Sequence, residues 1–446
     1  MKKAGIILLA LAVMGGVVGL PFAQEKITLT LEDSLKLALR QNPFYLAEKA
    51  KEDQASAMVR EAFASFLPSL TAQGTHILDK KVMTVEMPSL FGMPAQKFKL
   101  DFTRDYQLAL SFSVPLYAGG RIQSGYKQAN LNLEATREAI RQSMQDTVFN
   151  VKKAFYGYLL ALKFVDVAQE AVDLAEKHLK NVNSLFEVGM ASRFDLLRSE
   201  VQASNLKPHL IRARNGLNTA ELGLKTLLGL DLKQPVAVKG ELSYQAFEAD
   251  TDANVSQALT SRPELVQLNY QKQMAAEMVK MARAAYVPTL AVGGQYNYWG
   301  NQFNFKKDNW ESYYSINLVL NVPIFNGFVN AAKLGESKAM LKQLDYSQKG
   351  FTEMVKFEVH DAILNLGQAK ESLFSQEKNV EQAQEAVRIA ELNYKEGLAT
   401  NLDVSAAHVA LSQARTNHSQ ALFDYALALA QLEKAIGAGR EAPDGK

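Results

Sequence analysis

The side chains of this chain that could hold a metal or move a proton near neutral pH are six histidines. They stand at His76, His178, His209, His360, His408 and His418. None has the Glu-x-x-His or His-Glu-x-x-His spacing that puts ligands on one helix face. The sequence also holds no Gly-x-Ser-x-Gly elbow, no phosphate-binding loop and no cysteine. The residues therefore predict neither an enzyme nor a protein with a cofactor or metal site.

The elements that position these residues belong to a duplicated sequence. The segment 186–196 (FEVGMASRFDL) returns as 394–404 (YKEGLATNLDV), an offset of 208 residues. The junction 114–119 (VPLYAG) returns as 322–327 (VPIFNG) at the same offset, and Pro68 returns as Pro288 at an offset of 220. The first copy carries its extra residues in a turn-rich stretch near 79–98. Two copies of one unit predict an architecture that uses the unit twice.

The N-terminal segment predicts an exported protein. Lys2 and Lys3 precede an apolar run over 6–20, which is too short to span a bilayer comfortably and is typical of a signal peptide. No later stretch is apolar for long enough to be a transmembrane helix. The net charge of +2 favours no nucleic-acid partner.

The sequence therefore divides into five parts. We expect a signal peptide over 1–23, a first repeat over 24–230, a polar connector over 231–252, a second repeat over 253–437 and a flexible tail over 438–446.

Four stretches alternate apolar and polar residues, as a strand with two unlike faces must. They cover about 69–79, 99–114, 289–300 and 310–322. Their length of about ten residues suits a tilted strand that crosses a bilayer, and the alternative is an ordinary soluble sheet with one polar face. Four strands are too few to close a membrane barrel, and an open edge is not tolerated in lipid. We therefore expect several chains to share one barrel.

Long helices alternate with these strands. The segments that lead up to Gly189 and Gly397 have apolar residues at steps of three and four and predict helices of about 65 residues, roughly 100 Å long. Each glycine allows a turn into a second helix, over 193–228 or 401–436. Shorter helices are expected at 31–42, 44–66, 253–261 and 263–286. Pro208 in the second helix of the first copy predicts a kink or a break.

Four prolines mark the junctions between strands and helices. Pro68 and Pro288 are expected to end helices and lead into strands, whereas Pro115 and Pro323 are expected to end strands and lead into the long helices. Proline lacks the amide hydrogen that either kind of structure would need next.

These paired junctions and the two Gly-x-x-x-x-x-Asp turns give the chain its resemblance to the TolC family of outer-membrane channel proteins, over roughly residues 28–437. The resemblance implies an α+β membrane protein that forms a homotrimer. Each chain would give four strands to a shared 12-stranded transmembrane β-barrel in outer-membrane lipid. Its long antiparallel coiled-coil helices would form an α-barrel that projects into the periplasm of a Gram-negative-type bacterium.

The family's function implies a passive role in export. Such channels form tripartite efflux or type I secretion systems with a periplasmic adaptor and an inner-membrane transporter of the RND, ABC or MFS type. The alternative is a structural coiled-coil or adhesin-like outer-membrane protein without an open conduit. Ala, Gln, Asn and Ser are abundant along 120–190 and 330–395, which favours a lined conduit over a solid stalk.

The resemblance also implies a gate at the periplasmic tip. Asp403 falls on the family's constricting aspartate, which would form a cation-binding ring of three. Asp195 and Tyr394 fall on positions that hold the closed state by hydrogen bonds. The alternative for Asp403 is a helix N-cap.

This sequence departs from the family's gate at two places. Ala399 stands in place of a gate arginine, and Ala406 stands in place of a second aspartate. Whether Arg193 or Lys395 substitutes for the arginine stays open.

Overall fold

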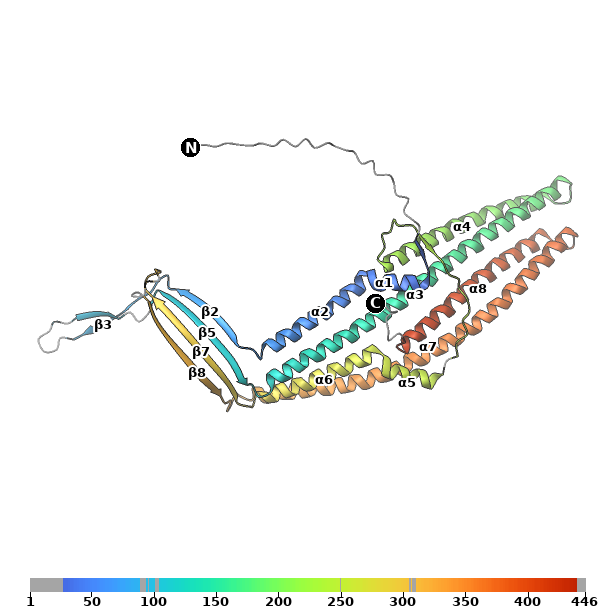
Figure 1. Cartoon of the computed structure of the whole chain (residues 1–446). Helices are drawn as coiled ribbons and strands as arrows, with labels where there is room; N and C mark the ends of the chain where they lie inside the picture. The colour runs from blue at the N-terminus through green and yellow to red at the C-terminus, as the bar shows by residue number, and fades with distance from the viewer. Residues whose placement is uncertain are drawn as a thin grey trace, which may run out of the picture. The chain divides into compact units, whose positions relative to one another are not determined.

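The computed structural model describes residues 27–88, 94, 96–100, 104–248, 250–304, 306 and 310–438 (Figure 1). The predicted signal peptide, and the tail beyond 438, lie outside these residues. The chain divides into two compact units, which are described separately. The first unit comprises the residues up to Gln41, Val151–Ser243 and Asn379–Phe423. The second comprises Asn42–Asn150, Tyr244–Lys378 and the residues from Asp424 onward.

The second unit contains one four-stranded antiparallel sheet in the order β2-β5-β7-β8 (Figure 1). Its strands are β2 (Ser69–His76), β5 (Tyr106–Tyr117), β7 (Thr289–Gly300) and β8 (Trp310–Asn321). Each copy of the repeat supplies two neighbouring strands, and the copies meet where β5 pairs with β7. Strands β2 and β8 are therefore the two edges of the sheet.

One face of the edge strand β8 is apolar and uncovered. Ile316, Leu318 and Leu320 are 69%, 67% and 63% exposed. They alternate with residues that point to the other face, among them Ser315, Asn317 and Asn321. Leaving such a face in water forfeits about 25 cal/mol for every Å² of apolar surface. Strand β8 thus presents a row of apolar side chains that this chain does not cover.

The prediction of the second strand of the first copy, over 99–114, was wrong at its start. Residues 96–100 belong to a separate hairpin, in which β4 (Gln96–Leu100) pairs with β3 (Met83–Met87), and β5 begins only at Tyr106. Asp105 lies at the base of this hairpin, because its carbonyl accepts from the amide of Ile77 at 2.8 Å and its carboxylate pairs with Lys80 at 2.6 Å. The stretch 79–98 is therefore partly strand. Its apolar residues Leu90, Phe91 and Met93 lie outside the described residues.

The proline at the end of β5 is placed differently from expectation. Pro115 does not end its strand, since β5 continues to Tyr117 through an irregularity in its pairing with β7. A bulge accommodates a residue without an amide hydrogen at this point. Pro323 follows the end of β8, and Pro68 and Pro288 each directly precede a strand, as predicted.

Four long helices follow the strands in pairs. They are α3 (Arg121–Glu187), α4 (Arg193–Leu228), α7 (Val329–Lys395) and α8 (Asn401–Ala435). Helices α3 and α7 each have 67 residues, which corresponds to roughly 100 Å. Of the kink or break predicted at Pro208, the break is wrong, because α4 runs through this residue. Pro208 is exposed, so water can reach the backbone carbonyl that loses its helical partner there.

The shorter helices also occur once in each copy. They are α1 (Leu31–Gln41), α2 (Pro43–Ala64), α5 (Thr251–Ser261) and α6 (Pro263–Ala284). Pro43 and Pro263 each occupy the first helical position, where the missing amide hydrogen has no helical partner to lose. Asn42 caps α2 by accepting from the amide of Phe44 at 2.8 Å.

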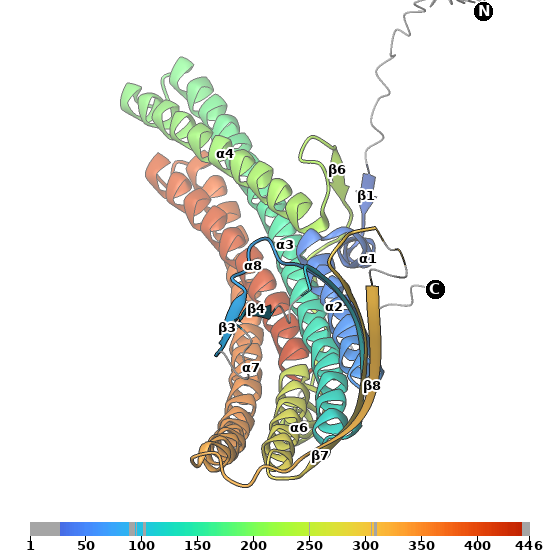
Figure 2. The ribbon, with the colours of Figure 1, turned by 90° about the vertical axis from the view of Figure 1, so that its left-hand side faces the viewer.

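The segment predicted as a polar connector contains a strand of the first unit. Strand β6 (Val236–Val238) pairs in parallel with β1 (Ile27–Leu29), and the two lie side by side in Figure 2. Val236 is 4% exposed and joins a core that includes Phe155, Leu224 and Leu228. Part of the segment 231–252 is therefore folded into the unit. None of the helices within the described residues is long and apolar enough to cross a membrane.

Candidate functional site

The two helix-to-helix turns of the first unit have the same geometry. Gly189 and Gly397 have φ angles of 78° and 73°, which glycine adopts without a steric penalty. The amide of Met190 donates to the carbonyl of Leu185, and that of Leu398 donates to the carbonyl of Asn393, each at 2.8 Å. These bonds span the end of the preceding helix and satisfy its last carbonyls. The duplicated sequence thus folds into two duplicated turns.

Both predicted aspartates help to start the helix that follows the turn. Oδ2 of Asp195 accepts from Oγ of Ser192 at 2.6 Å, and Oδ2 of Asp403 accepts from Oγ1 of Thr400 at 2.6 Å. The aspartate amides donate back to the same hydroxyls at 3.1 and 3.3 Å. Each carboxylate also accepts from the backbone amide of the N-cap residue, Ser192 at 3.4 Å or Thr400 at 2.8 Å, and this completes a capping box. Asp403 therefore caps the helix from the third helical position and is not itself the N-cap.

The carboxyl group of Asp403 is held in its charged form. The side-chain and backbone hydrogen bonds from Thr400 keep its pKa below the ordinary aspartate value. Asp403 is exposed, so its charge is also available to a solute cation.

Tyr394 lies at the end of α7, within the electrostatic range of Asp195. Burial raises the pKa of its phenol, and the negative charge of Asp195 raises that pKa further. The structure thus brings these two predicted residues together in one unit. Arg193, one of the two candidates for the missing gate arginine, lies with its guanidinium over the ring of Phe186 at 5.9 Å.

A buried polar cluster beside these residues was not predicted from the sequence. Nε2 of His178 lies 2.7 Å from Oδ1 of Asn401, and Nδ2 of Asn401 lies 2.9 Å from the carbonyl oxygen of Asp195 and 3.1 Å from Oγ of Ser199. His178, Asn401 and Ser199 are 8%, 3% and 2% exposed. The cluster joins α3, α4 and the first residue of α8.

One sequence signal could have revealed the cluster. His178 interrupts an apolar stripe of α3 that is formed by Val172, Ala175 and Val182, at helical steps of three and four. A histidine on a buried stripe needs a hydrogen-bond partner. The partner Asn401 stands far away in the sequence, which gives no sign of the pairing.

A second histidine packs against the first. The rings of His178 and His408 lie edge to face with centroids 5.8 Å apart, and Nε2 of His408 lies 2.9 Å from Oε1 of Glu391. The pKa of His178 is lowered by burial above all and by the nearby His408, whereas its hydrogen bond to Asn401 and the charge of Glu391 oppose the decrease. The net direction is downward, so the neutral imidazole is favoured.

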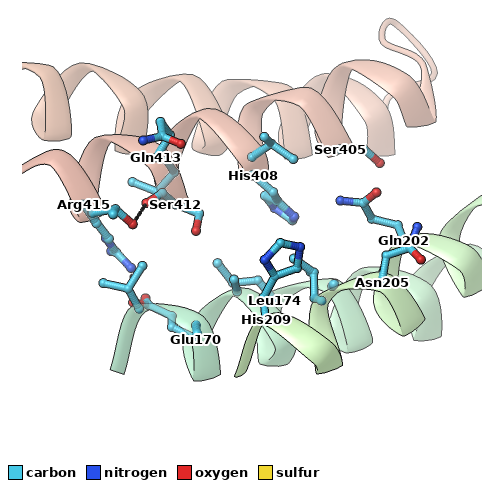
Figure 3. Close-up of a pocket in the computed structure, with 18 of the residues that line it drawn as sticks. Glu170, Leu174, Gln202, Asn205, His209, Ser405, His408, Ser412, Gln413 and Arg415 are labelled. Carbon is cyan, nitrogen blue, oxygen red and sulfur yellow. Dashed lines mark hydrogen bonds and ion pairs between the residues drawn. The ribbon is translucent and has the colours of Figure 1, made fainter. Parts of the chain in front are cut away.

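A cavity of about 500 Å³ lies beyond this cluster, between α3, α4 and α8. Apolar side chains of α3, such as Leu174, line one side, and Gln202 and Asn205 of α4 lie opposite residues of α8. Figure 3 shows His209 of α4 and His408 of α8 reaching into the same space. The described residues hold no cluster of three or more His, Cys, Asp or Glu side chains that could bind a metal ion.

Comparison with known proteins identifies the family. The model of the outer membrane efflux protein family matches residues 34–230 and 254–438. The chain belongs to this family. It is 24% identical over 422 residues to the outer membrane protein TolC of Vibrio cholerae, and the match covers 90% of this chain and 89% of that protein. It is 25% identical over 434 residues to the alkaline protease secretion protein AprF of Pseudomonas aeruginosa, covering 94% of this chain and 86% of that protein.

Solved structures of outer-membrane channels have the same fold. The CmeC outer membrane channel of Campylobacter jejuni matches with a TM-score of 0.75 and 15% identity, over 100% of this chain and 96% of that one. The open state of the MtrE outer membrane channel of Neisseria gonorrhoeae matches with a TM-score of 0.73 and 19% identity, over 92% and 89%.

The family membership and these neighbours confirm four of the predictions. The fold is that of long helices combined with a few strands, as in outer-membrane channels. The chain is an outer-membrane efflux channel and not an enzyme. Its place is the outer membrane, with the helical part in the periplasm. The roles of Asp403, Asp195 and Tyr394 in a gate stay predictions.

Proposed function

We propose that this chain forms a homotrimeric channel-tunnel that conducts substrates passively from a periplasmic adaptor and an inner-membrane transporter to the outside. The single observation that carries the proposal is the four-stranded sheet with two free edges, β2 and β8. The exposed apolar face of β8 favours contact with lipid. Lipid cannot hydrogen-bond the backbone groups of an open sheet edge, so such an edge is not tolerated there. Other copies of the chain are the natural source of strands that close the barrel.

The duplicated helix turns support a tunnel entrance. Both turns carry a carboxylate at the third residue of the following helix, Asp195 in one and Asp403 in the other. In a trimer, threefold symmetry would place three copies of Asp403 around one axis. Three carboxylates in a ring attract cations and obstruct a narrow pore electrostatically. Tyr394 and Asp195, whose negative charge helps to raise the pKa of the Tyr394 phenol, would hold neighbouring helix pairs in the closed arrangement.

The partners follow from the relatives. AprF is named as a secretion protein for alkaline protease, and a further relative of Pseudomonas putida is named as an export protein for pyoverdine. Relatives with such different cargoes favour a conduit whose selectivity resides in the transporter and adaptor. The proposed transporter belongs to the RND, ABC or MFS type.

Bilayer conductance separates the channel from the adhesin-like alternative. The purified full-length protein is reconstituted into planar lipid bilayers, and single-channel currents are recorded in salt solution. A conduit gives discrete current steps, whereas a solid stalk on a shared barrel gives none. Step-free recordings from protein whose insertion is verified by flotation with lipid vesicles would contradict the proposal.

A further inference from the structure

The side chain of Asn401 uses both its donors and its acceptor on other helices. Its Nδ2 donates to the Asp195 carbonyl and to Ser199 Oγ of α4, and its Oδ1 accepts from Nε2 of His178 on α3. The bond to the Asp195 carbonyl, which can only accept, fixes which end of the amide is the nitrogen. Asn401 is 3% exposed, so any bond that it loses leaves a polar atom buried without a partner.

Asn401 stands where it can control the predicted gate. It is the first residue of α8, it follows the capping residue Thr400, and it comes two positions before Asp403. The equivalent position of the other hairpin is Arg193, whose guanidinium lies over Phe186 of its own hairpin. This polar anchor therefore exists in only one of the two copies.

We propose that Asn401 is the positioning residue that holds the entrance closed within one protomer, by fastening the start of α8 to His178, Ser199 and the Asp195 carbonyl. The inference rests on the proposed channel function.

The cavity explains why a polar anchor matters at this place. From Ser405 to Thr416, α8 borders the hollow of about 500 Å³, so side chains of α3 and α4 do not fill the space beneath this part of the helix. Unfilled space lacks the close atomic contacts that normally hold two helices together. An ion pair between Arg415 and Glu170 bridges α8 and α3 beside the hollow. Polar links at Asn401 and Arg415 thus take over part of the role of apolar packing.

The latch has a pH-dependent member. His178 is faced by Asn401 of α8, by His408 of α8 with its partner Glu391 of α7, and by the ring of Tyr394 of α7 at 5.6 Å. In the arrangement described here, with α8 fastened at Asn401, burial favours the neutral imidazole. Release of α8 would let water reach His178 and return its pKa toward about 6.5. The released form then binds the proton more tightly, so closure weakens as the pH falls below about 6.5.

The first test compares two asparagine variants in planar bilayers near neutral pH. Asn401→Ala is expected to raise the fraction of time that the channel is open about fivefold, the factor that corresponds to one buried hydrogen bond of about 1 kcal/mol. The control is Asn183→Ala, because Asn183 is exposed on α3 and its side chain donates to Glu187 of the same helix, at 2.8 Å. Equal open fractions in the two variants would overturn the proposal.

The second test uses the pH response and does not require Asn401→Ala to assemble. Open fractions are measured at pH about 7.5 and about 5, on either side of the ordinary histidine pKa of about 6.5. His178→Gln keeps a side-chain N–H donor that cannot titrate, so it is expected to stay closed near neutrality and to lose the acid-induced opening. His209→Gln, which changes an exposed histidine on the border of the same cavity, is expected to keep it. A retained acid response in His178→Gln would overturn the proposal.

The recording from the wild-type protein distinguishes a failure of the proposed channel function from a failure of the proposed latch at Asn401. Wild-type protein that gives no current steps contradicts the channel function itself. Wild-type protein that conducts, together with variants that behave like their controls, contradicts the latch alone.

Discussion

Gly120 and Phe328 occupy equivalent positions of the two copies, and both have a positive φ, 86° and 68°. Each follows a glycine that also has a positive φ, Gly119 or Gly327. The left-handed conformation costs a residue with a side chain roughly 1–2 kcal/mol. The second copy therefore carries a strained phenylalanine where the first copy uses glycine. The ring of Phe328 is 74% exposed and lies edge-on to Phe325 with centroids 5.4 Å apart.

Replacing this phenylalanine tests the strain. Phe328→Gly is expected to leave the thermal stability of the detergent-solubilised protein unchanged or to raise it, by up to about 1 kcal/mol, because the released strain exceeds the added flexibility of the unfolded chain. Gly120→Ala, where nothing lies within 4 Å of the new Cβ, is expected to lower the stability by about 1 kcal/mol through conformation alone. Thermal denaturation followed by circular dichroism measures both. A large loss in Phe328→Gly would show that the ring makes a contact worth more than the strain.

Alanine substitutions at Gly229 and Gly189 separate the cost of a steric clash from the cost of the positive φ angle alone. A Cβ at Gly229 would lie 2.5 Å from the carbonyl oxygen of Gln41, whereas a Cβ at Gly189 meets nothing within 4 Å. Both residues have a positive φ, 69° and 78°. Gly189→Ala is expected to cost about 1 kcal/mol, and Gly229→Ala is expected to cost clearly more, since α1 must move away. Equal melting temperatures for the two variants would contradict the packing of α1 on the end of α4.

Glu277 predicts an acid-sensitive contribution to stability. Its buried carboxylate lies 2.8 Å from Nζ of Lys280 and 3.1 Å from Nζ of Lys127. Burial alone would raise its pKa, but hydrogen bonds from Lys280, Lys127 and Ser124 outweigh burial and leave the pKa below the ordinary value. A carboxyl with a lowered folded-state pKa stabilises the fold above the ordinary value of about 4.3, and this stabilisation is lost as the pH falls through the lowered pKa.

The matching experiment compares Glu277→Gln with the wild type across pH. Near neutrality the variant is expected to be about 1–2 kcal/mol less stable, and the gap is expected to shrink below pH about 4. Glu353→Gln is the control, because the Glu353 side chain is 72% exposed and pairs with Lys356 on its own helix, where an ion pair contributes little. If the stability difference between Glu277→Gln and the wild type stayed as large in acid, the Glu277 carboxylate would not stabilise the fold through its charge on the two lysines.

The proposed role of Asp403 requires a control for helix capping. Asp403→Ala is expected to raise single-channel conductance or to weaken block by multivalent cations, because it removes the ring of carboxylates. It also removes a capping interaction worth about 0.5–2 kcal/mol. Thr400→Ala removes the two hydroxyl bonds of the same capping box and keeps the carboxylate, together with the backbone amide of residue 400 that donates to it. If both variants change the cation block equally, the effect comes from the helix start and Asp403 has no separate role in the gate.

The sequence predicted regular helices and strands well, but it did not predict where a strand is interrupted or where a helix continues through a proline. Helix α4 begins and ends at the expected residues, because the capping Ser192 and the final Gly229 are local signals. The hairpin of β3 and β4 was missed, since the alternation around Leu100 continues across Arg104 and hides the interruption at Asp105. Pro208 also misled, because an exposed proline can remain in a long helix that tertiary contacts support.

The candidate site was predicted only in part. The repeated turns and the resemblance pointed to Asp195, Asp403 and Tyr394, and in the structure Tyr394 lies within the electrostatic range of Asp195. The contact of His178 with Asn401 joins residues 223 positions apart, and no periodic pattern encodes such a pairing. Packing of α8 against α3 and α4 creates it. Polar contacts between distant helices are thus the part of this site that only the folded chain reveals.

The most direct measurement of the central claim is cross-linking between the two free sheet edges in the membrane. The chain has no cysteine, so only introduced thiols can react. Thr71→Cys in β2 is combined in turn with a cysteine at Ser315, Asn317 or Asn321 of β8, and membranes are oxidised before electrophoresis. The account predicts that at least one pair yields a covalent ladder that ends at three chains, while Thr71→Cys alone yields none. Monomers from every pair, or a ladder that continues beyond three, would contradict a barrel shared by three copies.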